Sequence, residues 1–198
     1  MKNRIVAVLL VLLMIVIAGQ AGASAPSSAK QAQLLRAEGS NILVAYFSCT
    51  GNTRSLAEHM ASSLNATLYE IMPATPYSTG DLDSRDKTSR SSIEQKDDSA
   101  RPAISGAVKN MAEFDIVFLG YPVWFGQAPK IINTFLERYD FSGKTIIPFC
   151  TSGKSGIGSS ATNLHRLVAN SAVWLSGARL PIGATKNDVE KWIGSLDI

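Results

Sequence analysis

The sequence predicts an α/β domain: a doubly wound, five-stranded parallel sheet of order 2-1-3-4-5 with helices on both faces. Short apolar runs alternate with helix-patterned segments from residue 41 to the C-terminus. A strand that is a nearly continuous apolar run is typical of a parallel sheet buried on both faces. Strands that alternate with helices form such a sheet, and ligands bind beyond the carboxyl ends of its strands.

Five segments are expected to form the strands, the first being the apolar run NILVAYFS, and Gly177 weakens the last of them. They are residues 41–48, 67–72, 116–121, 144–150 and 172–180.

Five further segments carry helical patterns, as in the spacing of Leu56, Met60 and Leu64. Thr185 or Asn187 is expected to cap the last helix. The predicted helices cover residues 54–64, 107–114, 129–139, 159–169 and 188–196.

The N-terminus has the order of an export signal. Lys2 and Arg4 precede an apolar run over residues 5–18, and small residues follow. We therefore expect a signal peptide at 1–25, a linker at 26–40 and the folded domain at 41–198. An uncleaved membrane anchor is the alternative, so the expected location is the periplasm, the extracellular space or the outer face of the cytoplasmic membrane.

Composition supports one buried core and excludes a nucleic-acid partner on electrostatic grounds. Hydrophobic residues make up 45% of the chain, and the formal net charge is +3. Setting aside Lys2 and Arg4 leaves 17 of the 19 basic residues against 16 acidic ones. A nucleic-acid-binding domain would need a clear basic excess.

One polar segment interrupts the alternation of strands and helices. Residues 76–102 are rich in Ser, Asp, Lys and Arg, and they are too numerous for an ordinary connection. The segment is either a solvated, mobile insertion or a flap over the ligand.

The turn after the first strand predicts an anion site. Hydroxyl side chains, a glycine and an asparagine meet there at a helix start, where backbone N–H groups and the helix dipole favour an anion. The alternative is a simple N-capping turn, although one cap accounts for one hydroxyl only. The loop consists of Ser48, Cys49, Thr50, Gly51, Asn52 and Thr53.

This loop resembles the phosphate loop of the flavodoxins, whose pattern is S/T-x-T-G-x-T after the first strand. The resemblance extends from about residue 41 to the C-terminus and implies a flavodoxin-like fold with bound FMN. It implies that Ser48, Thr50, Asn52 and Thr53 bind the FMN phosphate, with Cys49 and Gly51 in the same loop.

The loop after the third strand supports a flat aromatic ligand. Adjacent Trp124 and Phe125 are costly to expose, and aromatic side chains stack on flat rings. By the resemblance, Trp124 stacks on the flavin and its neighbours line the ring edge. The alternative is plain packing beneath the insertion. The neighbours are Pro122, Val123, Phe125 and Gly126.

The loop after the fourth strand lacks both nucleotide signatures. The glycine that a Walker A loop requires is replaced by Pro148, and no acidic residue follows at the spacing of a dinucleotide fingerprint. By the resemblance, backbone N–H groups of this loop contact the flavin edge. The loop has no aromatic residue, so the second flavin face is open or covered by Tyr77. The contacting residues are Thr151, Ser152, Gly153 and Gly158.

Cysteines and histidines do not form a metal or triad pattern. Cys49 and Cys150 follow strands separated by a third, roughly 9–10 Å apart at about 4.8 Å per strand, too far for a disulfide. We expect both thiols to be free and buried. His59 and His165 are isolated, so no metal site is predicted.

These patterns predict an FMN-binding redox protein, either an electron carrier or a reductase of a small acceptor such as a quinone. The flavin supplies the chemistry, so no catalytic side chain is assigned. The alternative is a non-enzymatic module that binds a phospholigand on the same fold. A phosphatase using Cys49 would need an arginine in the loop, and Arg54 lies one residue too far. The redox donor and acceptor stay unidentified, and the N-terminal segment could tether the chain to a membrane.

Overall fold

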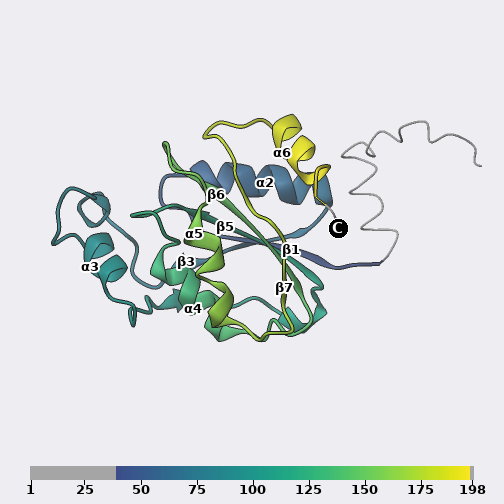
Figure 1. Cartoon of the computed structure of the whole chain (residues 1–198), viewed down its shortest axis with the longest axis horizontal. Helices are drawn as coiled ribbons and strands as arrows, with labels where there is room; N and C mark the ends of the chain where they lie inside the picture. Colours follow the sequence, from purple (N-terminus) through teal and green to yellow (C-terminus); the bar gives the residue numbers. More distant parts are fainter. Residues whose placement is uncertain (1–38, 197–198) are drawn as a thin grey trace, which may run out of the picture.

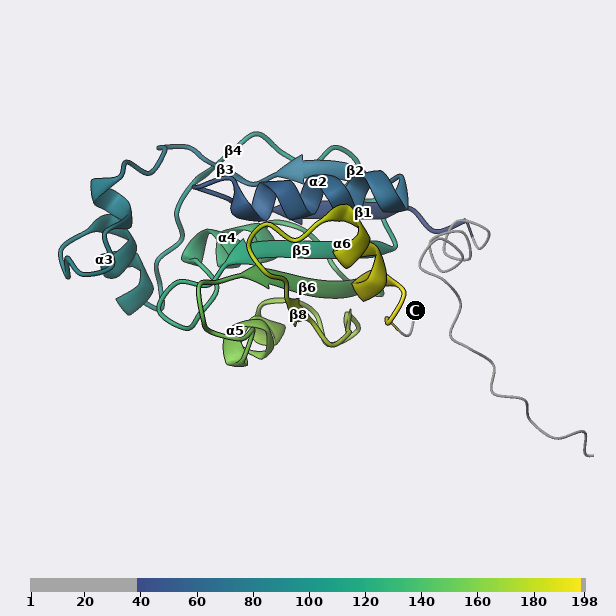
Figure 2. The same ribbon diagram turned by 90° about the horizontal axis from the view of Figure 1, so that it is seen from above.

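The structure is a computed structural model that describes residues 39–196 (Figures 1 and 2). The expected signal segment and most of the expected linker lie outside the described residues. Within 39–196, no helix is both long and apolar enough to cross a membrane.

A parallel sheet forms the centre of the molecule. Its order is β2-β1-β5-β6-β7, and β8 also pairs with β6. The predicted order 2-1-3-4-5 is therefore confirmed, because β5 and β6 are the third and fourth predicted strands. The strands are β1 (Ile42–Tyr46), β2 (Thr67–Glu70), β5 (Ile116–Pro122), β6 (Thr145–Thr151), β7 (Val173–Trp174) and β8 (Ala178–Arg179).

Helices cover both faces of the sheet (Figure 1). The helices α2 (Asn52–Leu64) and α6 (Lys186–Ile193) pack on one face, over a core that includes Met60 and Phe118. The helix α4 (Lys130–Arg138) packs on the other face, over a core that includes Phe135. The α6 helix begins with a capping box between Thr185 and Asp188, which confirms one of the two predicted caps.

Two predicted helices are shorter than expected. Residues 107–114 hold only the 3-10 turn η2 (Met111–Glu113), because Asn110 before it adopts a left-handed φ of 52° that an α-helix cannot contain. The helix expected at 159–169 is α5 (Ser159–Thr162), followed by the separate 3-10 turn η3 (His165–Leu167).

The fifth predicted strand is split into β7 and β8. Ile146 pairs with Trp174, and Phe149 pairs with Ala178. Between these pairs β6 advances by three residues, whereas the edge of the sheet advances by four. This extra residue is a bulge opposite Pro148, whose nitrogen has no hydrogen to donate to a neighbouring strand. At Gly177 in the bulge, a Cβ would lie 2.4 Å from the Pro148 carbonyl oxygen, so only glycine fits.

The polar insertion, residues 76–102, has secondary structure of its own although most of its residues are exposed, and its role as a flap stays a prediction. Its base is closed by the antiparallel pair β3 (Met72–Pro73) and β4 (Ile104–Ser105). It contains the 3-10 turn η1 (Gly80–Leu82) and the helix α3 (Arg90–Lys96). Its buried polar side chains belong to Ser89, which caps α3, and to Ser91 and Ser92.

Candidate functional site

The three predicted ligand loops meet at the carboxyl ends of β1, β5 and β6. The buried hydroxyls of Thr53 and Thr151 lie 2.8 Å apart and share a hydrogen bond between the first and third loops. The Val123 N–H donates to the Thr151 carbonyl oxygen at 2.8 Å and joins the second loop to the third. The structure therefore brings together loops that are about 100 residues apart in sequence.

Within residues 39–196, the start of α2 has no side-chain cap. Gly51 is the N-cap residue with a left-handed φ of 84°, and among the described residues no side chain caps this helix. Its first turn contains no acidic residue, and first-turn amides have no partner within a helix. The capping interpretation of this loop is wrong, and the positive end of the helix dipole faces the loop.

The side chains of the first loop differ in what they can offer a ligand. Thr50 is exposed and accepts a hydrogen bond from the Asn52 side-chain amide at 3.1 Å. Ser48 accepts from the Gly51 N–H at 3.1 Å, which shapes the turn. Thr53 is only 1% exposed, and its hydroxyl is hydrogen-bonded to Thr151. A ligand could therefore bond its backbone N–H rather than its side chain.

Neither thiol is set up as a nucleophile. Both cysteines are free, but only Cys150 is buried, so the prediction that Cys49 is buried is wrong. Although Cys49 is exposed as a residue, local desolvation of its thiol raises its pKa to about 11. Arg54, which a phosphatase would use, is instead paired with Glu70 at 2.5 Å.

The second loop is a tight hairpin with a strained tip. Trp124 and Gln127 exchange two backbone hydrogen bonds of 2.9 Å across Phe125 and Gly126. Both tip residues have positive φ, 50° at Phe125 and 77° at Gly126, as in a type I′ turn. Phenylalanine is an unusual residue in this conformation, and its side chain is 51% exposed. Strain of this kind is concentrated at functional sites.

Trp124 contacts residues of the insertion. Its ring lies edge-on to Phe47 and Tyr77, with centroid distances of 5.5 and 5.3 Å. Its carbonyl oxygen accepts a hydrogen bond from the Gln95 side chain of α3 at 3.2 Å. The packing alternative therefore describes what this structure shows, and stacking of Trp124 on a ring stays a prediction. Phe125 is the more exposed ring at this loop.

Tyr77 packs against the rings of Phe47 and Trp124 and also contacts two charged side chains. Its hydroxyl donates to the Glu94 carboxylate at 2.5 Å, and the Arg90 guanidinium lies 4.0 Å from its ring centroid. Burial, with the Glu94 contact, raises the pKa of Tyr77 well above its usual range. The insertion thus contributes a packed wall to the site.

Hydrogen bonds within the third loop and to Arg179 fix its shape. The Ser152 hydroxyl bonds the Ser155 carbonyl oxygen, and Gly158, at a φ of 47°, leads into α5. Gly153 is exposed, and its carbonyl oxygen accepts from Arg179 at 3.4 Å. The loop lies beside the first two, as predicted, but which of its N–H groups contact a ligand stays a prediction.

Three amide side chains link the second loop to neighbouring helices, and sequence reasoning did not single them out. The Asn163 side chain donates to the Gln127 side-chain oxygen at 2.8 Å and ties α5 to the second loop. Gln95 bridges α3 to both Trp124 and Ala128. A single amide side chain carries no sequence pattern, so only the fold reveals them.

Among residues 39–196, no group of three His, Cys, Asp or Glu side chains could hold a metal ion. His165 stacks on Trp174 with centroids 4.4 Å apart, which is a structural role.

A model of the flavodoxin family matches residues 41–196. The chain is 43% identical to a candidate flavoprotein of Bacteroides eggerthii, with a TM-score of 0.75, over 80% of this chain and 99% of that one. It is 44% identical to a candidate flavoprotein of Bacteroides uniformis, with a TM-score of 0.74, over 78% and 97%.

A more distant structure is a flavoprotein of Lactobacillus acidophilus NCFM solved in complex with FMN. It is 23% identical, with a TM-score of 0.57, over 77% of this chain and 98% of that one. This similarity concerns the fold. The comparison with curated proteins found no match.

Proposed function

Because the chain belongs to the flavodoxin family, we propose that it binds FMN at the three loops and exchanges electrons through it. The observation that carries this proposal is the uncapped N-terminus of α2, which faces a loop of hydroxyl groups without any acidic residue in its first turn. Such a terminus is an anion site. The Lactobacillus acidophilus flavoprotein was solved in complex with FMN, so FMN is the flavin to test first.

In this proposal, the chain's residues bind and orient the cofactor. The hydroxyls of Ser48 and Thr50, the side chain of Asn52 and the first backbone amides of α2 would hold the phosphate. The bond between Thr53 and Thr151 fixes the distance between the phosphate loop and the third loop. FMN, when bound, supplies the electron-accepting chemistry.

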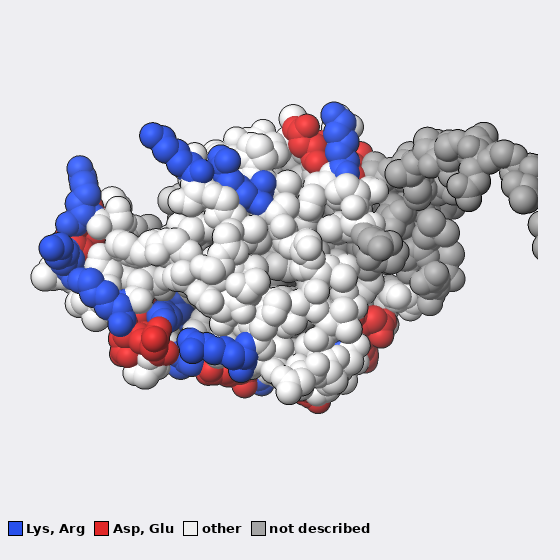
Figure 3. All heavy atoms as spheres, in the orientation of Figure 1, with Lys and Arg blue, Asp and Glu red and all other residues white. Residues whose placement is uncertain are grey.

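We propose further that the reaction partner is a small acceptor such as a quinone. The exposed ring of Phe125 offers an apolar contact beside the loops, and residues 151–158 add no aromatic cover. Figure 3 shows basic and acidic side chains mixed at the end of the molecule where α3 lies. A mixed surface gives little steering toward a charged protein partner, whereas a small neutral acceptor needs none.

The test of cofactor binding is an FMN titration of the purified full chain, followed by absorbance. We expect the bands of bound oxidised flavin to shift and sharpen, and dithionite to bleach them. Absence of binding at micromolar FMN would overturn the proposal and would favour the non-enzymatic phospholigand module.

The test of the acceptor is anaerobic mixing of the reduced, FMN-loaded protein with a soluble benzoquinone. Rapid return of the oxidised flavin band in a single two-electron step supports the reductase. Slow reaction with the quinone, together with fast reaction with a one-electron protein acceptor such as cytochrome c, would favour a carrier.

Export is also a proposal, and it rests on residues 1–25 alone. We expect the chain to be found outside the cytoplasm or bound to the outer face of the membrane. Cell fractionation with an antibody against the domain tests this, and recovery in the cytoplasm alone would contradict it.

A further inference from the structure

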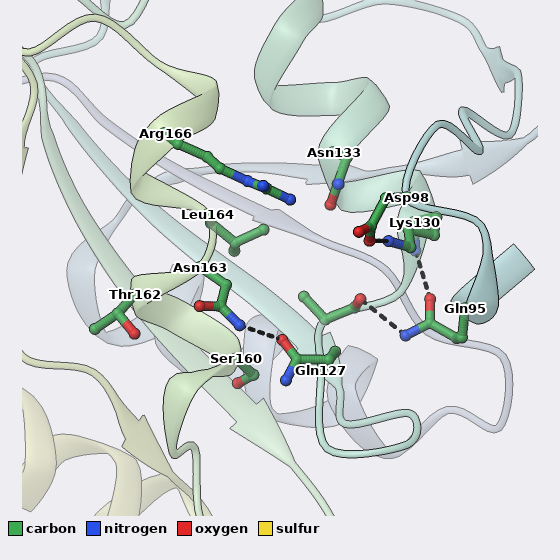
Figure 4. A pocket seen from close by; sticks show the side chains of 11 residues that line it. Gln95, Asp98, Gln127, Lys130, Asn133, Ser160, Thr162, Asn163, Leu164 and Arg166 are labelled. Atoms are coloured by element: carbon green, nitrogen blue, oxygen red, sulfur yellow. Dashed lines mark hydrogen bonds and ion pairs between the residues drawn. The ribbon is translucent and has the colours of Figure 1, made fainter.

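A polar cavity lies behind the second loop, away from the α2 terminus. It has a volume of about 430 Å³ and is lined from α3 and the chain after it, from the start of α4, and from α5 and η3 (Figure 4). That volume is within the range of small-molecule sites, which is about 300–1,000 Å³. The residues of the first loop do not line it.

Two polar side chains on α4 are deeply buried at this cavity. Asn133 is only 6% exposed, and among the described residues its side chain has no hydrogen-bond partner, although it points into the cavity (Figure 4). Among the described residues, the Tyr69 hydroxyl is the one buried side-chain atom without a partner, so the Asn133 amide is accessible from the cavity and can bond a ligand there. Lys130, with a side chain 9% exposed, forms an ion pair with Asp98 at 2.8 Å.

The remaining charge of the cavity is positive. Asp98 balances Lys130, whereas Arg166 makes no hydrogen bond or ion pair with any residue in the described range. Figure 4 shows the Arg166 side chain extending across the cavity toward Asn133. The Lys130 hydrogen bond chiefly, and Arg166 to a lesser extent, lower the pKa of Asp98.

We propose that this cavity binds a small molecule bearing one carboxylate, which pairs with Arg166 while its polar remainder bonds the Asn133 amide. A guanidinium presents parallel N–H donors that match a carboxylate, and one uncompensated positive charge matches one negative charge. The proposal goes beyond flavin binding and does not depend on it.

The cavity meets the second loop at a hydrogen-bonded contact. The Asn163 side chain donates to the Gln127 side-chain oxygen at 2.8 Å, and Gln127 lies between the hairpin tip and the cavity. A ligand here would contact the rear of the hairpin rather than its tip. Both sites should therefore be occupied at once without competition.

The experiment uses succinamate, which has one carboxylate and one amide, and its neutral analogue succinamide. The full chain, labelled with ¹⁵N, is titrated with each while the side-chain N–H signals of Asn133, Asn163 and Arg166 are followed. We expect saturable shifts with succinamate and at least tenfold weaker binding of succinamide. Absence of saturable shifts, or equal binding of the two compounds, would overturn the proposal.

Variants separate the cavity from general charge effects. Arg166→Ala should weaken succinamate at least tenfold and Asn133→Ala at least threefold. Arg85→Ala removes the same charge from a side chain that is 90% exposed and lies outside the cavity, so it should change nothing. Because Arg166 is exposed, its variant is expected to fold. Unchanged affinity in Arg166→Ala contradicts the proposal.

A final titration is made in the presence of saturating FMN. Succinamate affinity should stay within about twofold of its value without FMN. Direct competition would mean that the cavity belongs to the flavin site, and the proposal of a separate site would fail. This outcome differs from failure of FMN binding itself, which the absorbance titration reports independently.

Discussion

At the scale of single residues, the bond between Thr53 and Thr151 is a buried link between the first and third loops. Thr53→Val keeps the side-chain shape but leaves the Thr151 hydroxyl buried without this partner, at a cost of about 1–3 kcal/mol. The free energy of unfolding, measured in urea, should fall by that amount. Adding Thr151→Val should restore part of it, because no unsatisfied hydroxyl then remains. Additive losses in the double variant would contradict this account.

Phe125 shows strain that a different side chain would relieve. Its φ of 50° suits asparagine far better than phenylalanine at this position of a type I′ turn. Phe125→Asn should therefore raise the free energy of unfolding by about 1 kcal/mol. If the exposed ring contacts the acceptor, the same variant should slow quinone reduction several-fold. A variant that is both less stable and equally active would contradict the functional role of the strain.

At the scale of elements, the start of α2 offers a test in which stability and binding change in opposite directions. Asn52→Asp places a carboxylate at the positive end of the helix, which stabilises a helix by about 0.3–1 kcal/mol. The same carboxylate repels a phosphate, so FMN binding should weaken at least tenfold. The free energy of unfolding and the FMN dissociation constant are measured on the same sample.

Asn187→Asp is the matched control, because it adds the same charge to the first turn of α6. It should leave FMN binding unchanged. Equal losses of FMN affinity in both variants would show that the effect is general electrostatics rather than a phosphate at α2.

The edge of the sheet depends on one glycine. Gly177→Ala would place a Cβ 2.4 Å from the Pro148 carbonyl oxygen, so the edge must move and stability should fall by about 1–3 kcal/mol. Gly156→Ala is the control, because nothing lies within 4 Å of its added Cβ. Similar urea midpoints for the two variants would contradict the close contact.

The elements also show what sequence alone can predict. The buried strands and α2 were predicted because hydrophobic periodicity records burial directly. The helix expected at 107–114 failed because a left-handed Asn110 depends on the tertiary path of the chain, and the split of the last strand depends on Pro148 in another strand. The same limit holds at the site: local pattern identified the three loops, whereas the Gln95 and Asn163 contacts exist only after folding.

At the scale of the whole molecule, FMN binding and stability are linked. A ligand that binds only the folded chain stabilises it by RT ln(1 + [L]/Kd), or about 2.7 kcal/mol at a hundredfold excess over Kd. The three loops follow the adjacent strands β1, β5 and β6 and are joined through Thr151, so one ligand across them should stabilise the domain as a unit. Urea unfolding at fixed FMN should show the full increase in a single transition.

Riboflavin, which lacks the phosphate, separates the phosphate loop from the ring contacts. If the α2 terminus holds the phosphate, riboflavin at the same concentration should bind at least tenfold more weakly. It should then stabilise the chain by no more than about 1.4 kcal/mol. Asn52→Asp should reduce the effect of FMN toward that of riboflavin and leave the riboflavin effect unchanged. Equal stabilisation by the two flavins would place the binding energy in the ring contacts and remove the phosphate role from the first loop.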